Sequence, residues 1–215
     1  MDALAGEAAP TAPAGRRTRA GQLEANRAAL ITAACQVIGE EGYAKASVVK
    51  ITMQAGLGQG TFYTYFDSRQ ELFDILLPEV GAEMLEFVRE RVSRSQSLVE
   101  IEVGSYCAFA DYVRLNPWYG RILFEAETLA PQAARTNAHR VVTQHLTRLT
   151  HAWENGELPD YTLAEIPSLS STLLALRRHF VRTRMESYLP ALAADTLMEV
   201  SVKVIRRMLQ ASRAG

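Results

Sequence analysis

Hydrophobic residues recur along most of the chain at the three- and four-residue spacing of a helical face. The first clear example is Leu30, Ala34 and Ile38, which predicts a helix over residues 23–41. Gly42 follows this pattern, in the position that commonly ends a helix. No stretch alternates polar and apolar residues between turn dipeptides, so no strand is expected. The predicted fold class is all-α.

A shorter pattern comes next. Ser47 is a good N-cap for a second helix, and Gly56 supplies a tight turn without a Cβ penalty. A third, short helix is predicted over residues 61–66, where Phe62 and Phe66 are four apart and pack inward. A helix, a tight turn and a short helix are typical of a helix-turn-helix, whose second helix enters the DNA major groove.

The remaining surface of the third helix carries polar groups suited to DNA. Gln59 offers a donor and an acceptor to a base edge, and Gly60 allows close approach. Tyr63 and Tyr65 add hydroxyls for phosphate oxygens, with Thr64 beside them. An ordinary helical hairpin would show the same periodicity, so the pattern alone leaves both interpretations open.

The rest of the chain also reads as helices. The breaks fall at Asn116-Pro117, at Pro131, at Asn155-Gly156 and at Pro190. The predicted helices between them cover residues 69–91, 97–115, 118–129, 131–154, 163–188 and 191–213. No internal repeat is present.

Composition and charge narrow the function classes. The 215 residues are 48% hydrophobic with a net charge of −1, so the whole chain is not a polycation. Residues 16–69 nevertheless hold seven basic and four acidic residues, the sign expected of a small module that touches phosphates. The two cysteines, Cys35 and Cys107, suggest no disulfide framework and a reducing compartment. No apolar run long enough for a membrane span and no secretory signal occur, which favours a cytoplasmic protein without a membrane partner.

Residues 26–77 carry a dense set of motifs at unbroken spacing. The set comprises AA near the end of the first helix, then EEGY, Ser47 and Ile51, AG, GTFYTYF and SRQEL. This stretch resembles the DNA-binding domain of the TetR family of one-component transcription regulators. Two positions depart from the family: Gly58 stands where an N-capping serine is common, and Gln59 replaces a frequent Lys or Arg. The operator sequence therefore cannot be borrowed from better-known relatives.

The resemblance implies roles for individual positions. The residues placed to read bases, or beside those that do, are Gln59, Gly60, Tyr63 and Thr64. The residues placed to contact phosphate are Ser47, Thr61, Tyr65 and Arg69. A basic arm of Arg16, Arg17 and Arg19 is expected to reach the minor groove or to remain a solvated tail.

The resemblance also implies a ligand cavity and a homodimer built by the last two helices. Aromatic and apolar side chains with a few polar groups suggest a small, largely hydrophobic organic ligand. Its expected contacts are Tyr106, Phe109, Val113, Trp118, Phe124, His145, Leu149, Leu176 and His179. The expected dimer contacts are Leu173, Phe180, Leu197, Val200, Val204 and Met208. The alternative for the dimer contacts is burial within one subunit, and the alternative for the ligand contacts is ordinary core packing.

Together these features predict a tail over residues 1–21, a helix-turn-helix domain over 22–67 and a ligand-binding and dimerisation domain over 68–215. The expected function is a repressor released from a palindromic operator on double-stranded DNA by its ligand. No catalytic site, cofactor or metal is expected, because His139, His145 and His151 splay around one helix. The alternatives are an architectural DNA-binding protein without an inducer, or a sequestering or catalytic bundle with a vestigial N-terminal module.

Overall fold

The computed structural model describes residues 18–92, 97–185 and 194–210, and these ranges contain helices and no strands. The all-α prediction is confirmed. The helices in chain order are α1 (Arg19–Glu41), η1 (Tyr43–Lys45), α2 (Val48–Ala55), α3 (Gln59–Phe62), α4 (Arg69–Arg91), α5 (Leu98–Leu115), α6 (Tyr119–Leu129), α7 (Pro131–Glu154), η2 (Leu163–Glu165), α8 (Ile166–Met185) and α9 (Ala194–Leu209). No helix in the described ranges is long and apolar enough to cross a membrane.

The first helix begins earlier than predicted. The hydroxyl of Thr18 accepts a hydrogen bond from the Gly21 N–H at 3.2 Å, and this cap starts α1 at Arg19 rather than at residue 23. Arg19 therefore lies in the first turn of a helix, whereas the other two arginines of the expected arm lie outside the described residues. At its other end α1 stops at Gly42, whose φ of 86° is costly for any residue with a Cβ.

The helix-turn-helix forms from α2 and α3. Ser47 caps α2 by accepting from the Lys50 N–H, and Gly56 closes the turn in the left-handed region at φ 66°. The third helix covers only Gln59–Phe62, so the predicted range 61–66 is wrong at both ends. Beyond Phe62 the chain continues in tighter turns, in which the N–H groups of residues 64 and 65 bond to carbonyls three residues earlier.

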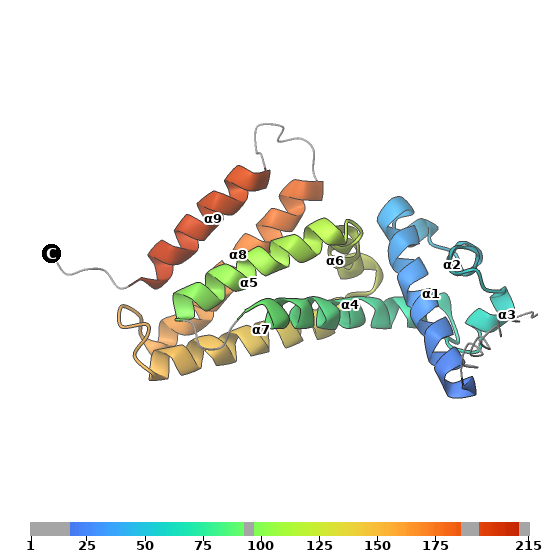
Figure 1. The fold of residues 1–215 in the computed structure, drawn as a ribbon, viewed down its shortest axis with the longest axis horizontal. Coiled ribbons are helices and arrows are strands. Elements are labelled where there is room, and N and C mark those ends of the chain that lie inside the picture. Colours follow the sequence, from blue (N-terminus) through green and yellow to red (C-terminus); the bar gives the residue numbers. More distant parts are fainter. Residues whose placement is uncertain (1–17, 93–96, 186–193, 211–215) are drawn as a thin grey trace, which may run out of the picture.

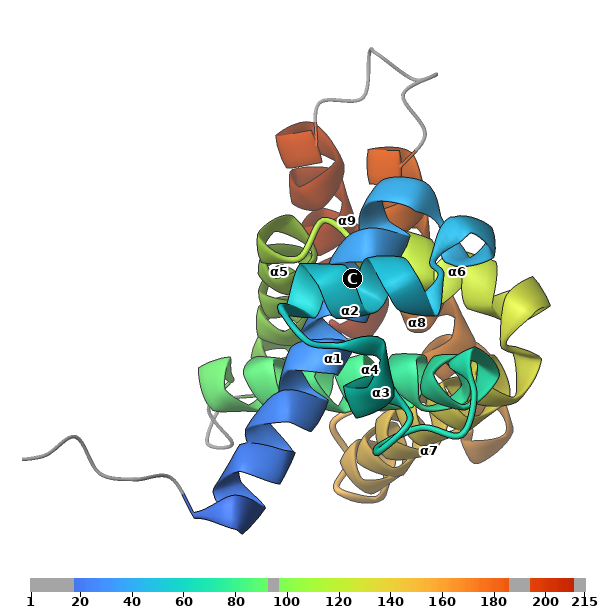
Figure 2. The same cartoon turned by 90° about the vertical axis from the view of Figure 1, so that its right-hand side faces the viewer.

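Helix α4 joins this small domain to the larger one. It runs from the α1–α3 end into the body of the molecule, where α7 lies alongside it (Figure 1). Seen from that end, α2 and α3 form the front of the molecule (Figure 2). Ser68 caps α4 by accepting from the Glu71 N–H at 3.1 Å. The helix also contains Pro78, which removes one backbone donor from its middle.

The two domains also meet through α6. Arg121 Nη1 donates to the carbonyls of Gly39 and Glu40, at 3.2 and 2.9 Å, at the end of α1. Glu125 accepts from the Tyr43 N–H at 2.8 Å. A Cβ on Gly39 would lie 2.4 Å from the Cβ of Trp118, so the start of α6 sits directly on α1. The C-terminal carbonyls of α1 are therefore satisfied by the larger domain.

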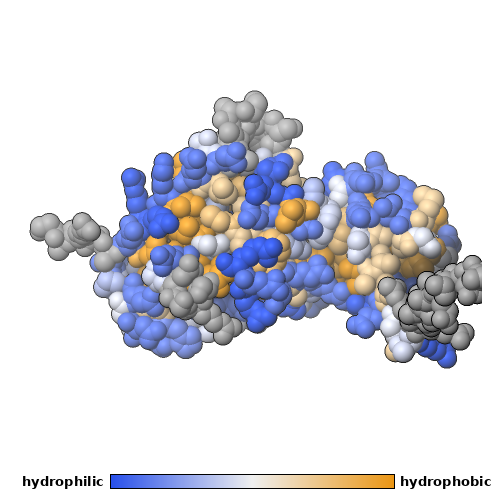
Figure 3. All heavy atoms as spheres, viewed as in Figure 1, coloured by the Kyte–Doolittle hydropathy of each residue, from blue (hydrophilic) through white to orange (hydrophobic). Residues whose placement is uncertain are grey.

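The larger domain packs α5, α7, α8 and α9 around a common core with α4. The single predicted segment over residues 163–188 is divided into η2 and α8, and the ends of the last two predicted helices lie outside the described residues. Seen from one side, hydrophobic side chains show as patches among hydrophilic ones on both domains (Figure 3). Exposed hydrophobic patches of this kind are candidate partner surfaces.

Candidate DNA-binding surface and ligand cavity

The side chains of α3 and of the residues directly after it fall into a buried group and an exposed group, as the sequence suggests. Phe62 is fully buried and Phe66 is 3% exposed, and their rings lie 5.4 Å apart beneath the helix. Tyr63 is 58% exposed, and Gln59 and Gly60 are exposed beside it. The two phenylalanines therefore anchor a short helix that presents a polar amide, a glycine and a phenol to solvent.

The residues expected to contact phosphate surround this helix and differ in how far their side chains are exposed. Arg69 is exposed, but its Nη1 reaches the Ala46 carbonyl at 3.5 Å and its guanidinium lies 5.3 Å from the Phe73 ring centre. Tyr65 is half-buried against Phe66, with ring centres 6.5 Å apart. The other two residues expected at phosphates, Ser47 and Thr61, are half-buried, and Thr64, expected beside the base-reading residues, is exposed.

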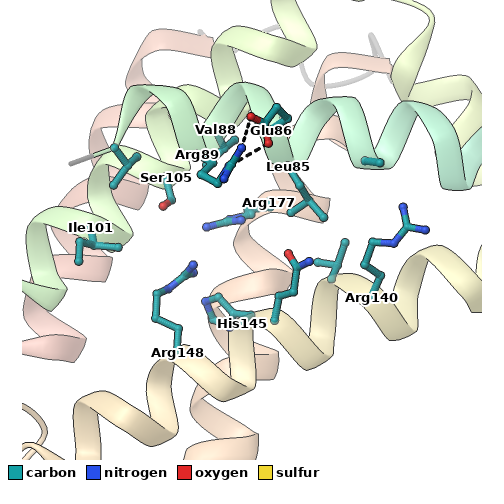
Figure 4. Close-up of a pocket in the computed structure, with 14 residues that line it drawn as sticks. Leu85, Glu86, Val88, Arg89, Ile101, Ser105, Arg140, His145, Arg148 and Arg177 are labelled. Atoms are coloured by element: carbon teal, nitrogen blue, oxygen red, sulfur yellow. Dashed lines mark hydrogen bonds and ion pairs between the residues drawn. The ribbon is translucent and has the colours of Figure 1, made fainter. Parts of the chain in front are cut away.

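A cavity of about 790 Å³ lies between α4, α5, α7 and α8, and its polar lining is mostly basic. Figure 4 shows the guanidinium groups of Arg89, Arg148 and Arg177 pointing into the same space, with Arg140 at the other end. The full lining is Ala82, Leu85, Glu86, Val88, Arg89, Val92, Ile101, Ser105, Arg140, Val141, Gln144, His145, Arg148 and Arg177. We call this space the arginine cavity.

A buried carboxylate stands behind the arginine cavity. Glu102 is 2% exposed and accepts from Arg148 Nε at 2.8 Å. Its other oxygen lies 3.1 Å from His145 Nε2 and 3.7 Å from Arg177 Nη2. His145 Nδ1 lies 2.7 Å from the Ser170 hydroxyl. A neutral imidazole that donates from Nε2 to the carboxylate and accepts at Nδ1 from the serine satisfies every partner.

The ionisation of this cluster follows from its contacts. Burial opposes the charged form of Glu102, but the hydrogen bond from His145 and the charges of Arg148 and Arg177 outweigh it and lower the pKa of Glu102 to about 2. Burial lowers the pKa of His145 more than the neighbouring carboxylate raises it. Burial likewise lowers the pKa of Arg177. One carboxylate therefore serves two guanidinium groups and a neutral histidine.

A smaller cavity of about 150 Å³ adjoins the first. Val141 and Arg177 line both cavities. Apart from Glu127, Asn137, Arg177 and Arg178, the second lining is apolar: Leu77, Met84, Phe109, Tyr119, Leu123, Ala134, Ala138, Val141, Val142 and Leu174. We call this space the apolar cavity.

Comparisons with known proteins agree with this architecture. Residues 30–76 match the model of the family described as bacterial regulatory proteins, tetR family. The helix-turn-helix region of the chain is therefore of the TetR type. The chain is 34% identical, over 71 residues, to the fatty acid metabolism regulator protein of Bacillus subtilis; the match covers 33% of this chain and 37% of that protein. The chain spans less than two thirds of the length of this and other curated relatives that it matches.

Solved structures share the TetR fold over nearly the whole chain. A TetR-family regulator from Syntrophomonas wolfei superimposes with a TM-score of 0.73 at 15% identity, covering 89% of this chain and 99% of that one. The regulator FadR from Bacillus subtilis, solved in complex with stearoyl-CoA, gives a TM-score of 0.73 at 18% identity, covering 86% of this chain and all of FadR. At these identities the likeness establishes the fold alone.

Most of the expected ligand contacts do not line a cavity. Two of the nine do, Phe109 in the apolar cavity and His145 in the arginine cavity. The other seven are buried in the core, half-buried outside both linings or, for His179, exposed: Tyr106, Val113, Leu149, Trp118, Phe124, Leu176 and His179. Apolar periodicity selected core residues because a helix that walls a cavity also buries a face against its neighbours.

The arginines were the residues that sequence reasoning missed. A signal for them exists on α7, where Arg140, Gln144 and Arg148 recur every four residues and so share one face. Such a polar stripe normally marks the solvent side of a helix. Only the packing of α4 and α5 over this stripe makes it the wall of a cavity.

The expected dimer contacts differ in how far they are exposed in a single chain. Leu173 and Phe180 are 3% and 2% exposed within a single chain, and the Phe180 ring packs against Tyr106, so little of either side chain is left for a partner to contact. Val200 and Val204 on α9 remain 48% and 37% exposed. The last two expected contacts, Leu197 and Met208, are partly buried against the chain's own core.

Proposed function

We propose that this chain is a homodimeric, ligand-responsive repressor. It binds a palindromic operator through α3 and is released when a small organic molecule enters the cavity between α4, α5, α7 and α8. Two-fold symmetry would place one recognition helix in each half-site, about 34–36 Å apart along the duplex.

The observation that carries the proposal is the exposure of Gln59, Gly60 and Tyr63 on a helix anchored by two buried phenylalanines. The Gln59 amide can donate to and accept from one base edge, while Gly60 lets the backbone approach the groove. Ser47 and Arg69 then lie near phosphates and fix the register of the helix on the duplex. The helix-turn-helix match of this family supports the same orientation.

The coupling between ligand and DNA runs through the contacts that α4 and α6 make with the small domain. Helix α4 contributes lining residues to both cavities and begins directly after the helix-turn-helix. A ligand acts only through its different affinity for the two states of the protein, and about 1–3 kcal/mol is a usual coupling energy. A shift of α4 relative to its partner copy would change the half-site spacing.

The ligand proposed here differs from the hydrophobic molecule expected from the sequence, because the larger cavity is lined by arginines. The complex of FadR from Bacillus subtilis with stearoyl-CoA supports acyl thioesters as early ligands to test. Such molecules combine an apolar chain with several negative charges.

The proposal is tested by fluorescence anisotropy of the full chain on DNA from upstream of its own gene. Sequence-specific binding that weakens steeply with salt is expected, because a dimer that contacts phosphates releases counterions. Binding that survives every candidate ligand and shows no sequence preference would favour the architectural alternative. Absence of DNA binding at low salt would overturn the proposal and favour the sequestering or catalytic bundle.

A further inference from the structure

We propose that the arginine cavity binds the anionic head of an amphiphilic ligand, a phosphate or a carboxylate, whose apolar chain enters the apolar cavity. This inference rests on the proposed function, since it names the chemical class of the ligand. Its binding test does not depend on DNA.

The first support is the charge of the lining. Arg89 is paired with Glu86 on the same helix, and Arg148 and Arg177 share the single carboxylate of Glu102. Among the residues that the structure describes, Arg140 bonds to a neutral carbonyl and to no carboxylate. In the described part of the chain, the cavity and its bonded neighbours therefore carry more guanidinium groups than carboxylates, so an anion that entered would find unmatched positive charge.

The second support is the burial of Arg177, which is 9% exposed and lies deepest among the cavity's arginines. Its Nη2 lies 3.7 Å from a carboxylate oxygen of Glu102, which is too long for a direct hydrogen bond. Within the described ranges the Arg177 side chain makes no hydrogen bond. A buried guanidinium normally has its donors matched, because its desolvation is costly. A ligand oxygen at this point would accept the hydrogen bonds for which the described residues provide no acceptor.

The third support is the position of Arg177 between the two cavities. Its side chain lines both, and its guanidinium lies 5.9 Å from the ring centre of Phe109 in the apolar cavity. A molecule that places its charged group at Arg177 therefore has its next atoms at the entrance to an apolar space. The basic lining also extends along α7 from Arg140 to Arg148, eight residues or about 12 Å. This length accommodates a head group larger than a single carboxylate.

A neutral apolar ligand fits this arrangement less well. It would fill the apolar cavity of about 150 Å³ but leave the larger, basic cavity without a partner. A free anion without a chain would meet the arginines but gain nothing from the apolar walls. The amphiphile alone uses both cavities.

Calorimetric titration of the full chain tests the assignment with four eight-carbon or chain-free probes: octyl phosphate, octanoate, octanol and inorganic phosphate. The two amphiphilic anions are expected to bind at least tenfold more tightly than octanol and than inorganic phosphate. Their ranking distinguishes a phosphate-type head group from a carboxylate. Equal or tighter binding of octanol would overturn the proposal, as would inorganic phosphate binding as tightly as octyl phosphate.

Variants locate the head group. Arg177→Gln and Arg148→Gln are expected to weaken the preferred anion at least tenfold and to leave octanol unchanged, whereas Arg177→Lys retains part of the affinity. Arg135→Gln is the matched control, because Arg135 is an exposed arginine of α7 bonded only to Gln132. Circular dichroism melting confirms folding, and Arg148, whose side chain is 36% exposed, provides a second test if Arg177→Gln unfolds. Full anion affinity in folded Arg148→Gln would contradict the proposal.

The failure of this inference can be told apart from failure of the proposed function. If anions bind the free protein through these arginines but no DNA is bound, the repressor proposal fails and the ligand class stands. If DNA is bound and octanol releases it while the anions do not, the repressor proposal stands and the ligand class is wrong.

Discussion

The side chain of Arg140 on α7 donates from Nη1 to the carbonyl oxygen of Pro78 on α4, at a distance of 2.7 Å. Pro78 has no N–H, so the carbonyl four residues earlier, at Asp74, lacks its helical donor and α4 is weakened at this turn. An arginine that lines the arginine cavity thus contacts the turn of α4 that contains Pro78. The cavity lining and the geometry of α4 therefore share one side chain.

The first prediction concerns the loss of the hydrogen bond from Arg140 to the Pro78 carbonyl. Arg140→Gln is expected to lower the free energy of unfolding by roughly 1.5–3 kcal/mol, the usual contribution of a hydrogen bond from a charged group. Urea denaturation measures this change. Arg135→Gln, on the same helix but exposed, should leave the unfolding midpoint unchanged. Equal midpoints for both variants would show that the Pro78 contact does not stabilise α4.

The Glu102 cluster predicts how stability depends on pH. The pKa of Glu102 is lowered from 4.5 to about 2 in the folded chain, so its stabilisation is fully present above about pH 4.5 and is lost as pH falls toward 2. The pKa of His145 is also lowered, so folding favours the neutral imidazole and loses stability as pH falls below 6.5. Both groups predict a decline in stability from neutral pH into acid.

The contribution of Glu102 to this decline is separated by substitution. Glu102→Gln is expected to cost about 3–5 kcal/mol near pH 7, because two guanidinium groups lose their buried counter-charge. The slope of unfolding free energy between pH 4.5 and 2 should become shallower at the same time. Glu165→Gln is the control, since Glu165 also has a lowered pKa but is exposed and bonds only to Thr162. An unchanged acid slope in Glu102→Gln would refute the assigned pKa.

The close contact between α4 and α7 predicts that a substitution on one helix compensates for a destabilising substitution on the other. A Cβ on Gly81 would lie 1.9 Å from Asn137 Oδ1, a buried oxygen with no hydrogen-bond partner in the described structure. Gly81→Ala is therefore expected to destabilise the chain by about 1–3 kcal/mol, despite the better helix propensity of alanine. Adding Asn137→Ala removes the obstructing oxygen and should recover most of the loss. Additive effects in this double-mutant cycle would mean that the two positions do not meet.

The sequence predicted the fold in outline because helical periodicity, caps and breakers are local. Ser47 and Gly56 were recognised, and Phe62 in α3 and Phe66 just after it are buried as predicted. Helix ends were less accurate where a cap was overlooked, as at Thr18.

The ligand site could not be predicted in the same way, because its walls are set by packing between distant segments. Arg89, Arg148 and Arg177 are separated by 29 residues or more, yet they face one cavity. Nothing local distinguishes them from arginines on a solvated surface. Glu102 likewise is one of several charged residues of α5, and only the structure brings its guanidinium partners to it.

Two substitutions separate base reading from phosphate contact. Gln59→Ala is expected to relax discrimination at one base position by about 1–3 kcal/mol while leaving affinity for unrelated DNA unchanged. Arg69→Ala should weaken binding to all sequences alike and reduce the salt dependence by about one phosphate contact. Anisotropy with an operator library at several salt concentrations measures both. If Arg69→Ala changed the sequence preference and Gln59→Ala did not, the assigned roles would be reversed.

The exposed face of α9 predicts where two copies meet. Val200 and Val204 are four residues apart on one helical face, and both remain exposed although much of the helix packs on its own chain. A glutamate at Val204 would place a charge where a symmetric interface brings the same position of both copies together, and charge is disfavoured at the centre of an interface. Val204→Glu is therefore expected to shift the chain from dimer toward monomer in sedimentation experiments, and to weaken operator binding because two half-sites are no longer bound together. Leu115→Glu is the control, since Leu115 is a 67% exposed leucine on a different helix, α5. A dimer that survives Val204→Glu but dissociates in Leu115→Glu would move the interface from α9 to α5.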